Sequence, residues 1–199
     1  MVSAQLACLS EAEYLAGEEL PGPRHEYIGG QIFAMAGATK THGTIAGNIF
    51  FALRAHLRGT PCRAWIADMK VNVATANAYY YPDLVATCAD EDLRRDSPQS
   101  FVTTPKMIVE VLSPSTEKID RREKWLAYRQ LDSLQEYMLV DQERQWVEVF
   151  RRNETGWMQE IAMAGEAITL SSLGVSLTLS DIYEDTDVPA VSVQTDEAD

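Results

Sequence analysis

Two carboxylates, Asp83 and Glu110, occur where the surrounding residues are apolar. Glu110 interrupts the run MIVEVL, and Asp83 follows three tyrosines and a proline in YYYPDLV, so that both acids are expected inside buried strands. An ionised carboxylate is costly to bury unless an arginine, a proton or a metal ion compensates its charge. Because two such acids occur in similar settings, we favour a metal ion that both of them bind.

If the two strands are neighbours, Asp83 and Glu110 converge, and each raises the pKa of the other unless a cation lies between them. Magnesium binds through one or two carboxylates and keeps several waters for substrate phosphates. The pair therefore predicts a Mg²⁺ site, which Mn²⁺ could also fill. The expected chemistry is phosphate-ester hydrolysis, because the ion polarises the phosphate and lowers the pKa of an attacking water.

A lysine that could complete such a site lies in the segment after Glu110, which is helical in character from about Thr116 to Leu131. Asp120, Lys124 and Tyr128 follow one another at intervals of four residues and share one helix face. The long stem of Lys124 could bring its charge to the adjacent strand. Two alternatives remain: Asp120 and Lys124 form an ordinary surface ion pair, or Lys124 neutralises Glu110 without a metal.

Four motifs, in this order, resemble a known family: YYYPDLV, IVEVLSPST, DRREKWLAY and EYMLVD. They are similar to the Uma-type family of restriction-endonuclease-like proteins in the PD-(D/E)XK nuclease superfamily, over roughly residues 10–183. The resemblance implies a restriction-endonuclease-like fold and magnesium-dependent cleavage of phosphodiester bonds. One position departs from the superfamily pattern, because Leu112 stands where a lysine is expected two residues after Glu110.

The resemblance also implies roles for further residues. Asp120 and Lys124 fall on recurrent family positions, which makes Lys124 the first choice for a relocated catalytic lysine. Lys70, expected on a strand adjacent to Asp83, is the second choice, and Lys118, close to the turn after Glu110, is the third. Glu26 matches a recurrent acid that is either a third metal ligand or a supporting group, with a surface hairpin residue as the alternative. His42 matches a recurrent histidine, with an ordinary helix-face residue as the alternative.

Periodicity and turn signals predict the elements that position these residues. A helix over EAEYLAGEEL starts at a capping box of Ser10 and Glu13, a hairpin turns at Gly29-Gly30, and a long helix covers residues 41–58. PKMIVEVL is apolar throughout, as in a central strand buried on both faces. The remaining expected strands are RAWIADMKVNV, AYYYPDLVAT, EYMLVD, WVEVFRR, WMQEIAMA and the segment ITLSSLGVSLTLSDIY. Together they predict an α/β (α+β) fold, with a central mixed sheet flanked by helices and additional hairpins.

The 199 residues suit a single domain, expected over residues 1–185. Residues 186–199 lack apolar periodicity, and we expect an acidic, disordered tail there. Seven acids after residue 180, without a lysine or arginine, supply much of the net charge of −13. Three scattered cysteines, Cys8, Cys62 and Cys88, indicate buried thiols. Neither a signal peptide nor a membrane span is apparent, so a cytoplasmic protein without a membrane partner is expected.

The leading hypothesis is a magnesium-dependent endonuclease that acts on nucleic acid, with DNA favoured over RNA. A nuclease fold that binds or regulates without cleavage is one alternative, motivated by Leu112 and the acidic balance. A metal-dependent phosphoesterase acting on small nucleotides is another. Nucleases that cut both strands often pair two sites about a two-fold axis, so we expect a homodimer, with the strands after residue 145 as its interface.

Overall fold

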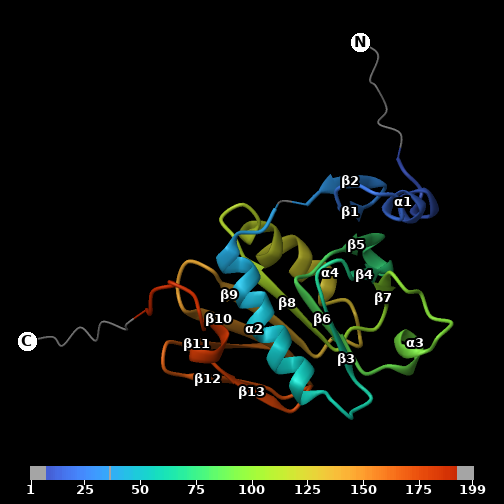
Figure 1. Ribbon diagram of the computed structural model, residues 1–199. Coiled ribbons are helices and arrows are strands. Elements are labelled where there is room, and N and C mark those ends of the chain that lie inside the picture. Colours follow the sequence, from blue (N-terminus) through green and yellow to red (C-terminus); the bar gives the residue numbers. More distant parts are fainter. Residues whose placement is uncertain (1–7, 36, 192–199) are drawn as a thin grey trace, which may run out of the picture.

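The computed structural model describes residues 8–35 and 37–191 and contains a six-stranded sheet, a five-stranded sheet and a two-stranded hairpin (Figure 1). The six-stranded sheet has the order β11-β10-β9-β8-β6-β3. Its strands are β3 (Arg63–Ile66), β6 (Leu84–Thr87), β8 (Met107–Leu112), β9 (Glu136–Asp141), β10 (Trp146–Asn153) and β11 (Gly156–Met163). The five-stranded sheet has the order β2-β1-β5-β4-β7. Its strands are β1 (His25–Ile28), β2 (Gln31–Ala34), β4 (Lys70–Val73), β5 (Ala78–Tyr80) and β7 (Phe101–Val102).

Helices and a small hairpin cover the sheets. The helices are α1 (Glu11–Glu18), α2 (Lys40–His56), α3 (Asp90–Leu93), α4 (Trp125–Tyr128) and α5 (Leu179–Ile182), with the short 3₁₀ turn η1 (Ala74–Ala76) and the π-helical segment η2 (Ile119–Lys124). Strands β12 (Ala167–Leu170) and β13 (Val175–Thr178) form the hairpin. The expected mixed sheet flanked by helices is confirmed.

Strand β8 is the central strand that its apolar sequence predicted. It pairs parallel with β9 and antiparallel with β6, and all six of its residues are buried. Alternate side chains enter two different cores: Val109 and Val111 pack on the side of α2 and β12–β13, whereas Ile108 and Leu112 pack on the side of α4 and the five-stranded sheet. Because successive side chains of a strand alternate, Glu110 also points between the two sheets.

Two long expected strands are each divided between the sheets, which corrects the prediction from periodicity. RAWIADMKVNV forms β3 in one sheet and β4 in the other, separated at Ala67 and Asp68, whose φ angles of 50° and 46° lie in the left-handed region. AYYYPDLVAT likewise forms β5 and β6. Asp83 is therefore not inside a strand: it lies after Pro82 at the point where the chain crosses from one sheet to the other.

The expected helices form close to their expected bounds. Ser10 and Glu13 make the capping box of α1. Thr39 caps α2, which buries Ile45, Ile49 and Leu53 against the six-stranded sheet. The hairpin of β1 and β2 turns at Gly29 and Gly30, where positive φ angles favour glycine.

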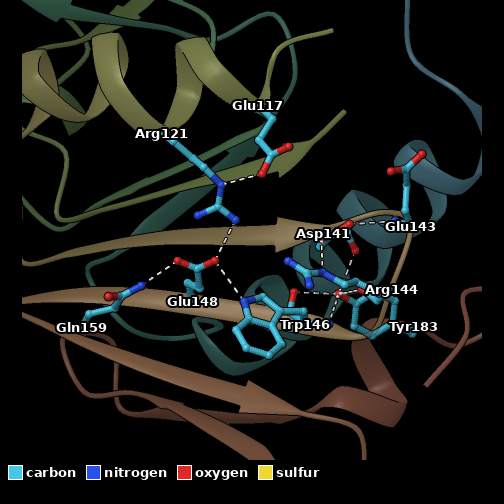
Figure 2. Close-up of polar contacts among 9 residues, drawn as sticks. All are labelled: Glu117, Arg121, Asp141, Glu143, Arg144, Trp146, Glu148, Gln159 and Tyr183. Carbon is cyan, nitrogen blue, oxygen red and sulfur yellow. Dashed lines mark hydrogen bonds and ion pairs between the residues drawn. The ribbon is translucent and has the colours of Figure 1, made fainter. Parts of the chain in front are cut away.

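The expected helix after Thr116 is helical but not regular, because η2 is π-helical before α4 continues it. Arg121 connects η2 to β10: its guanidinium donates to Glu117 Oε1 and to Glu148 Oε1, at 2.7 Å each (Figure 2). Trp146 Nε1 and Gln159 Nε2 also donate to the Glu148 carboxylate, at 2.9 Å and 2.7 Å. These bonds hold the segment that carries Asp120 and Lys124 against the sheet.

The expectation of three thiols was wrong for two cysteines, because Cys62 and Cys88 form a disulfide. The pairing of β3 with β6 puts Arg63 opposite Thr87, so the next residues outward, Cys62 and Cys88, face each other. The separation of 26 residues hides this contact in the sequence. Cys8 is a free thiol as expected, but it is exposed, so the burial expected for it was also wrong.

The packed chain continues past the boundary expected at residue 185. Val188 is buried in the core, and Gln145 N donates to Pro189 O at 2.9 Å. Ala190 forms a parallel bridge with Gln145. Residues 192–199 of the expected tail lie outside the described residues. Within residues 8–35 and 37–191, no helix has both the length and the apolarity that crossing a membrane requires.

Replacing Arg121 by methionine (Arg121→Met) should lower the free energy of unfolding by roughly 1.5–3 kcal/mol at pH 7, the usual contribution of hydrogen bonds to a charged group. Burial opposes ionisation of Glu148, but its bonds to Arg121, Trp146 and Gln159 outweigh burial and lower its pKa. The contribution is therefore present at neutral pH and disappears as the pH falls below about 4. Urea denaturation at both pH values measures it.

The exposed neighbouring residue provides the control, because Arg122→Met should change the free energy of unfolding by less than about 0.5 kcal/mol. Equal effects of the two substitutions at pH 7 would contradict the role assigned to Arg121.

Candidate active site

A buried lysine joins three carboxylates from three separate elements. Lys124 Nζ lies 3.0 Å from Glu26 Oε1 on β1, 3.1 Å from Glu110 Oε1 on β8 and 3.1 Å from Asp120 Oδ1 on η2. The side chains of Lys124, Glu110 and Asp120 are 8%, 4% and 2% exposed. The expected shared face of Asp120 and Lys124 is confirmed, but their pair is buried and is not an ordinary surface pair.

The acidic surroundings change the protonation of the buried groups. Burial raises the pKa of Glu110 well above its ordinary value; Lys124 lowers it, whereas the neighbouring carboxylates of Asp120, Asp83 and Glu26 raise it further. Burial alone would lower the pKa of Lys124, but the three carboxylates around it hold that pKa well above its ordinary value. The surrounding carboxylates therefore favour the protonated form of Lys124.

Asp120 leaves one oxygen without a hydrogen bond. Its Oδ1 is the single buried side-chain oxygen or nitrogen without such a partner among the residues that the structure describes. The atom is close enough to Lys124 Nζ for an ion pair but lies off the direction of a hydrogen bond. Tyr128, the next residue on this face, donates its hydroxyl to Glu110 Oε1 at 3.2 Å.

Asp83 lies at the edge of this cluster and is held by two other elements. Its Oδ2 accepts a 2.6 Å bond from the backbone N–H of Val111, the residue after Glu110. Its Oδ1 is 2.7 Å from Nε2 of His42, in the first turn of α2. Burial would lower the pKa of His42, but the hydrogen bond and charge of Asp83 outweigh burial and raise it. The two expected segments are thus neighbours: β6, which follows Asp83, pairs with β8, which carries Glu110.

Glu26 depends on a backbone contact that sequence reasoning missed. The N–H of Tyr81 donates to Glu26 Oε1 at 3.1 Å, and the hydroxyl of Tyr81 donates to Glu18 Oε2 at 2.6 Å. Every residue except proline has a backbone N–H, so the residue type at position 81 does not reveal this contact. Nothing in the sequence indicates that Glu18 holds the Tyr81 hydroxyl. Tyr81 therefore connects α1 to the carboxylate that contacts Lys124.

The structure places the other two lysine candidates away from this cluster. Lys70 begins β4, which pairs with β5, the first part of the segment that leads to Asp83, so its expected place beside that segment is confirmed. Its Nζ donates to the Tyr81 hydroxyl at 3.3 Å, and burial lowers its pKa. Lys118, a third candidate close to the turn after β8, is exposed. Lys124 is the lysine that reaches Glu110.

Three carboxylates thus contact one ammonium and Asp83 lies beside them, so the acids of the cluster of Glu26, Asp83, Glu110, Asp120 and Lys124 outnumber its lysine. In residues 8–35 and 37–191, no three side chains of histidine, cysteine, aspartate or glutamate form a group that could hold a metal ion. Lys124 lies among three of the acids and separates them. A metal would have to use fewer protein ligands, at Asp83 and Glu110.

Replacing Lys124 by methionine (Lys124→Met) should lower the free energy of unfolding by about 3–5 kcal/mol, because it leaves Glu110 and Asp120 buried without their cation. Lys118→Met removes an exposed lysine just before the same helical segment and should cost less than about 0.5 kcal/mol. Chemical denaturation of the two variants at pH 7 provides the measurement. Equal stability would show that the buried carboxylates do not need this lysine.

Comparison with known proteins identifies relatives along nearly the whole chain. The Uma2 family, described as "Putative restriction endonuclease", matches residues 11–180. Two uncharacterized proteins of Synechocystis sp. (strain ATCC 27184 / PCC 6803 / Kazusa) are each 37% identical. The protein slr1290 aligns over 182 residues, 91% of this chain and 94% of the relative. The protein sll1609 aligns over 142 residues, 71% and 80% respectively.

The fold is also similar to a crystal structure described as "a putative nuclease belonging to DUF820" from Anabaena variabilis ATCC 29413. The TM-score is 0.71 at 19% identity, over 86% of this chain and 96% of the other. The similarity confirms the expected restriction-endonuclease-like fold, and the family match supports a nuclease function. The chain belongs to the Uma2 family, as the four ordered motifs indicated.

Proposed function

We propose that this protein is a metal-dependent endonuclease that hydrolyses phosphodiester bonds in DNA, with Mg²⁺ as its cofactor and Mn²⁺ as a substitute. The observation that carries the proposal is the excess of buried carboxylates over cations around Lys124. A buried cluster of this kind is costly unless protons or a cation compensate it. A family described as restriction endonucleases supplies the substrate class.

The residues fit a hard divalent cation. Asp83 and Glu110 offer carboxylate oxygens, the ligands that magnesium prefers, and two carboxylates are enough because magnesium keeps several of its waters. Glu110 Oε1 is engaged by Lys124 and Tyr128, whereas Glu110 Oε2 makes no hydrogen bond to the described residues. Burial and the neighbouring carboxylates together raise the pKa of Glu110, and the opposing effect of Lys124 offsets this only in part.

The protein groups would divide the work of hydrolysis. When bound, the metal would polarise the scissile phosphate and lower the pKa of a water. Lys124, fixed as a cation, would stabilise negative charge that develops on the phosphate. His42 and the Val111 N–H would hold the Asp83 carboxylate in place, and Tyr128 would do the same for Glu110.

Lys124 takes the role that Leu112 cannot supply. In this fold Leu112 packs in the core beside Ile108, so a charge at that position would be buried among apolar groups. The ammonium of Lys124 extends instead from η2, and Asp120 on η2 and Glu26 on β1 help to hold it. This arrangement favours an active enzyme over a nuclease fold that has lost its lysine.

Asp83→Asn and Glu110→Gln should each reduce cleavage of DNA with Mg²⁺ by roughly 100-fold or more, because they remove ligand charge worth several kcal/mol in the transition state. Each should also weaken Mn²⁺ binding in calorimetry. Glu143→Gln, which removes an exposed acid after β9, is the matched control. Unchanged cleavage in both variants would contradict the assignment.

The same experiments distinguish the alternative functions. Intact folding without Mn²⁺ binding at millimolar concentration would favour a binding or regulatory module. Hydrolysis of small nucleotides but not of supercoiled, linear or single-stranded DNA would favour a phosphoesterase. RNA cleaved in preference to DNA would change the substrate but not the site.

His42→Gln should weaken Mn²⁺ binding by about 10- to 100-fold, as substitutions of groups that orient metal ligands usually do. The reason is the 2.7 Å contact that fixes Asp83 Oδ1. His56→Gln, at the other end of α2, should leave Mn²⁺ affinity unchanged. Equal affinities of the two variants would show that His42 does not position Asp83.

A further inference from the structure

Strand β2 is an unprotected edge of the five-stranded sheet. It lies beside β1 and α1 at the margin of the molecule (Figure 1), and all four of its residues are exposed. Ile32, Phe33 and the following Met35 are 48%, 47% and 40% exposed. Proteins usually protect such an edge with charges, proline or a bulge, because its free N–H and C=O groups pair readily with another strand. From Gln31 to Met35 the chain contains neither a charge nor a proline.

The other edges of the two sheets are charged or short. β11 carries Glu160, which pairs with Arg151. β3 begins with Arg63, whose guanidinium donates to Thr60 O and Cys62 O. β7 has only two residues. Among the described residues, β2 is the edge that best suits pairing, and it is a better candidate than the strands after residue 145.

We propose that β2 is the interface of a homodimer, in which two copies pair their β2 strands antiparallel about a two-fold axis. A second copy of the chain can pair with β2 because the apolar strip of residues Gln31 to Met35 carries no charge. Two chains that each carry a net charge of −13 repel one another wherever acidic surfaces meet, so an apolar strip is where they can approach. Pairing would also satisfy the free backbone groups of the edge.

Existing hydrogen bonds determine the register of this pairing. Met35 N donates to Arg24 O at 3.0 Å, so by the alternation of antiparallel strands Phe33 also bonds toward β1, and Ile32 and Ala34 direct their backbone groups outward. Gly30 O already accepts from Leu9 N at 2.8 Å, which closes that end of the edge. Ile32 should therefore lie opposite the partner's Ala34, with about four hydrogen bonds in total.

Phe33 then lies at the two-fold axis, opposite the partner's Phe33. Glu26 and Phe33 are paired across β1 and β2, and directly opposite residues project from the same face of a sheet. Both copies of Glu26 would thus lie on one face of a continuous sheet. Three strand spacings separate them, which is about 14 Å between backbones. If the proposed nuclease function holds, two sites at this separation would act on one substrate molecule.

Light scattering after size exclusion tests the interface on the full chain. The chain has a mass of 22.2 kDa, so the dimer should have twice that mass, about 44 kDa, at micromolar concentration. Phe33→Asp should raise the dissociation constant at least 100-fold and give a monomer with an unchanged circular dichroism spectrum. Phe51→Asp alters a more exposed phenylalanine, 76% exposed on α2, and should leave the dimer intact. A monomeric wild-type chain, or dissociation by Phe51→Asp alone, would overturn the proposal.

Cross-linking tests the register. Opposite residues of a pair that is not hydrogen-bonded have Cβ atoms about 4.5–5.5 Å apart, close to the separation in a disulfide. In a Cys8→Ser background, Phe33→Cys should give a dimer band that a reductant removes, whereas Ile32→Cys, opposite Ala34 of the partner subunit, should give far less. The reverse result would overturn the register.

Truncation and an activity assay complete the test of the β2 interface. Dimerisation only after removal of residues 1–7 would mean that the chain covers its own edge, and would overturn the proposal. Because mass and cross-linking do not depend on cleavage, a dimer without nuclease activity would support the interface and contradict only the proposed function.

Discussion

The burial of Lys124 among three carboxylates is the interaction on which the arrangement of the site depends. Glu26, Glu110 and Asp120 come from β1, β8 and η2, so one ammonium joins the two sheets and the helical segment between them. A buried charge is tolerated only with close partners of opposite sign, and removing either side leaves the other uncompensated. The same contacts that stabilise the fold therefore keep the candidate catalytic groups together.

Asp83 is positioned by the short segment in which the chain crosses from the five-stranded to the six-stranded sheet. Pro82 and Asp83 lie where the chain leaves one sheet and enters the other, next to β8. A residue at such a crossing is less buried than its strand neighbours, and the Asp83 side chain is 24% exposed against 4% for Glu110. One acid thus lies close to solvent and the other in the interior, which suits the proposed function, in which a cation and a phosphate would have to enter the site.

The net negative charge of the chain bears on how it could bind nucleic acid. Counterion release by lysine and arginine normally drives binding to nucleic acid, and a net charge of −13 opposes it. A divalent ion at Asp83 and Glu110 would offset most of the negative charge of the acids at the site. The uncharged edge strand β2 would allow two acidic copies of the chain to associate, because no acidic side chains would meet along it.

Four ordered motifs were enough to indicate the family, and periodicity, capping and turn residues were enough to predict α1, α2, the hairpin of β1 and β2, and the central strand β8. Asp83, Glu110 and Lys124 could also be identified in this way, since charges in apolar segments are conspicuous. Three features required the folded structure: Asp83 lies between the sheets, Cys62 and Cys88 are bonded, and Lys70 contacts Tyr81. Each of these depends on which strands become neighbours, and strand pairing between distant segments leaves no periodic signal in the chain.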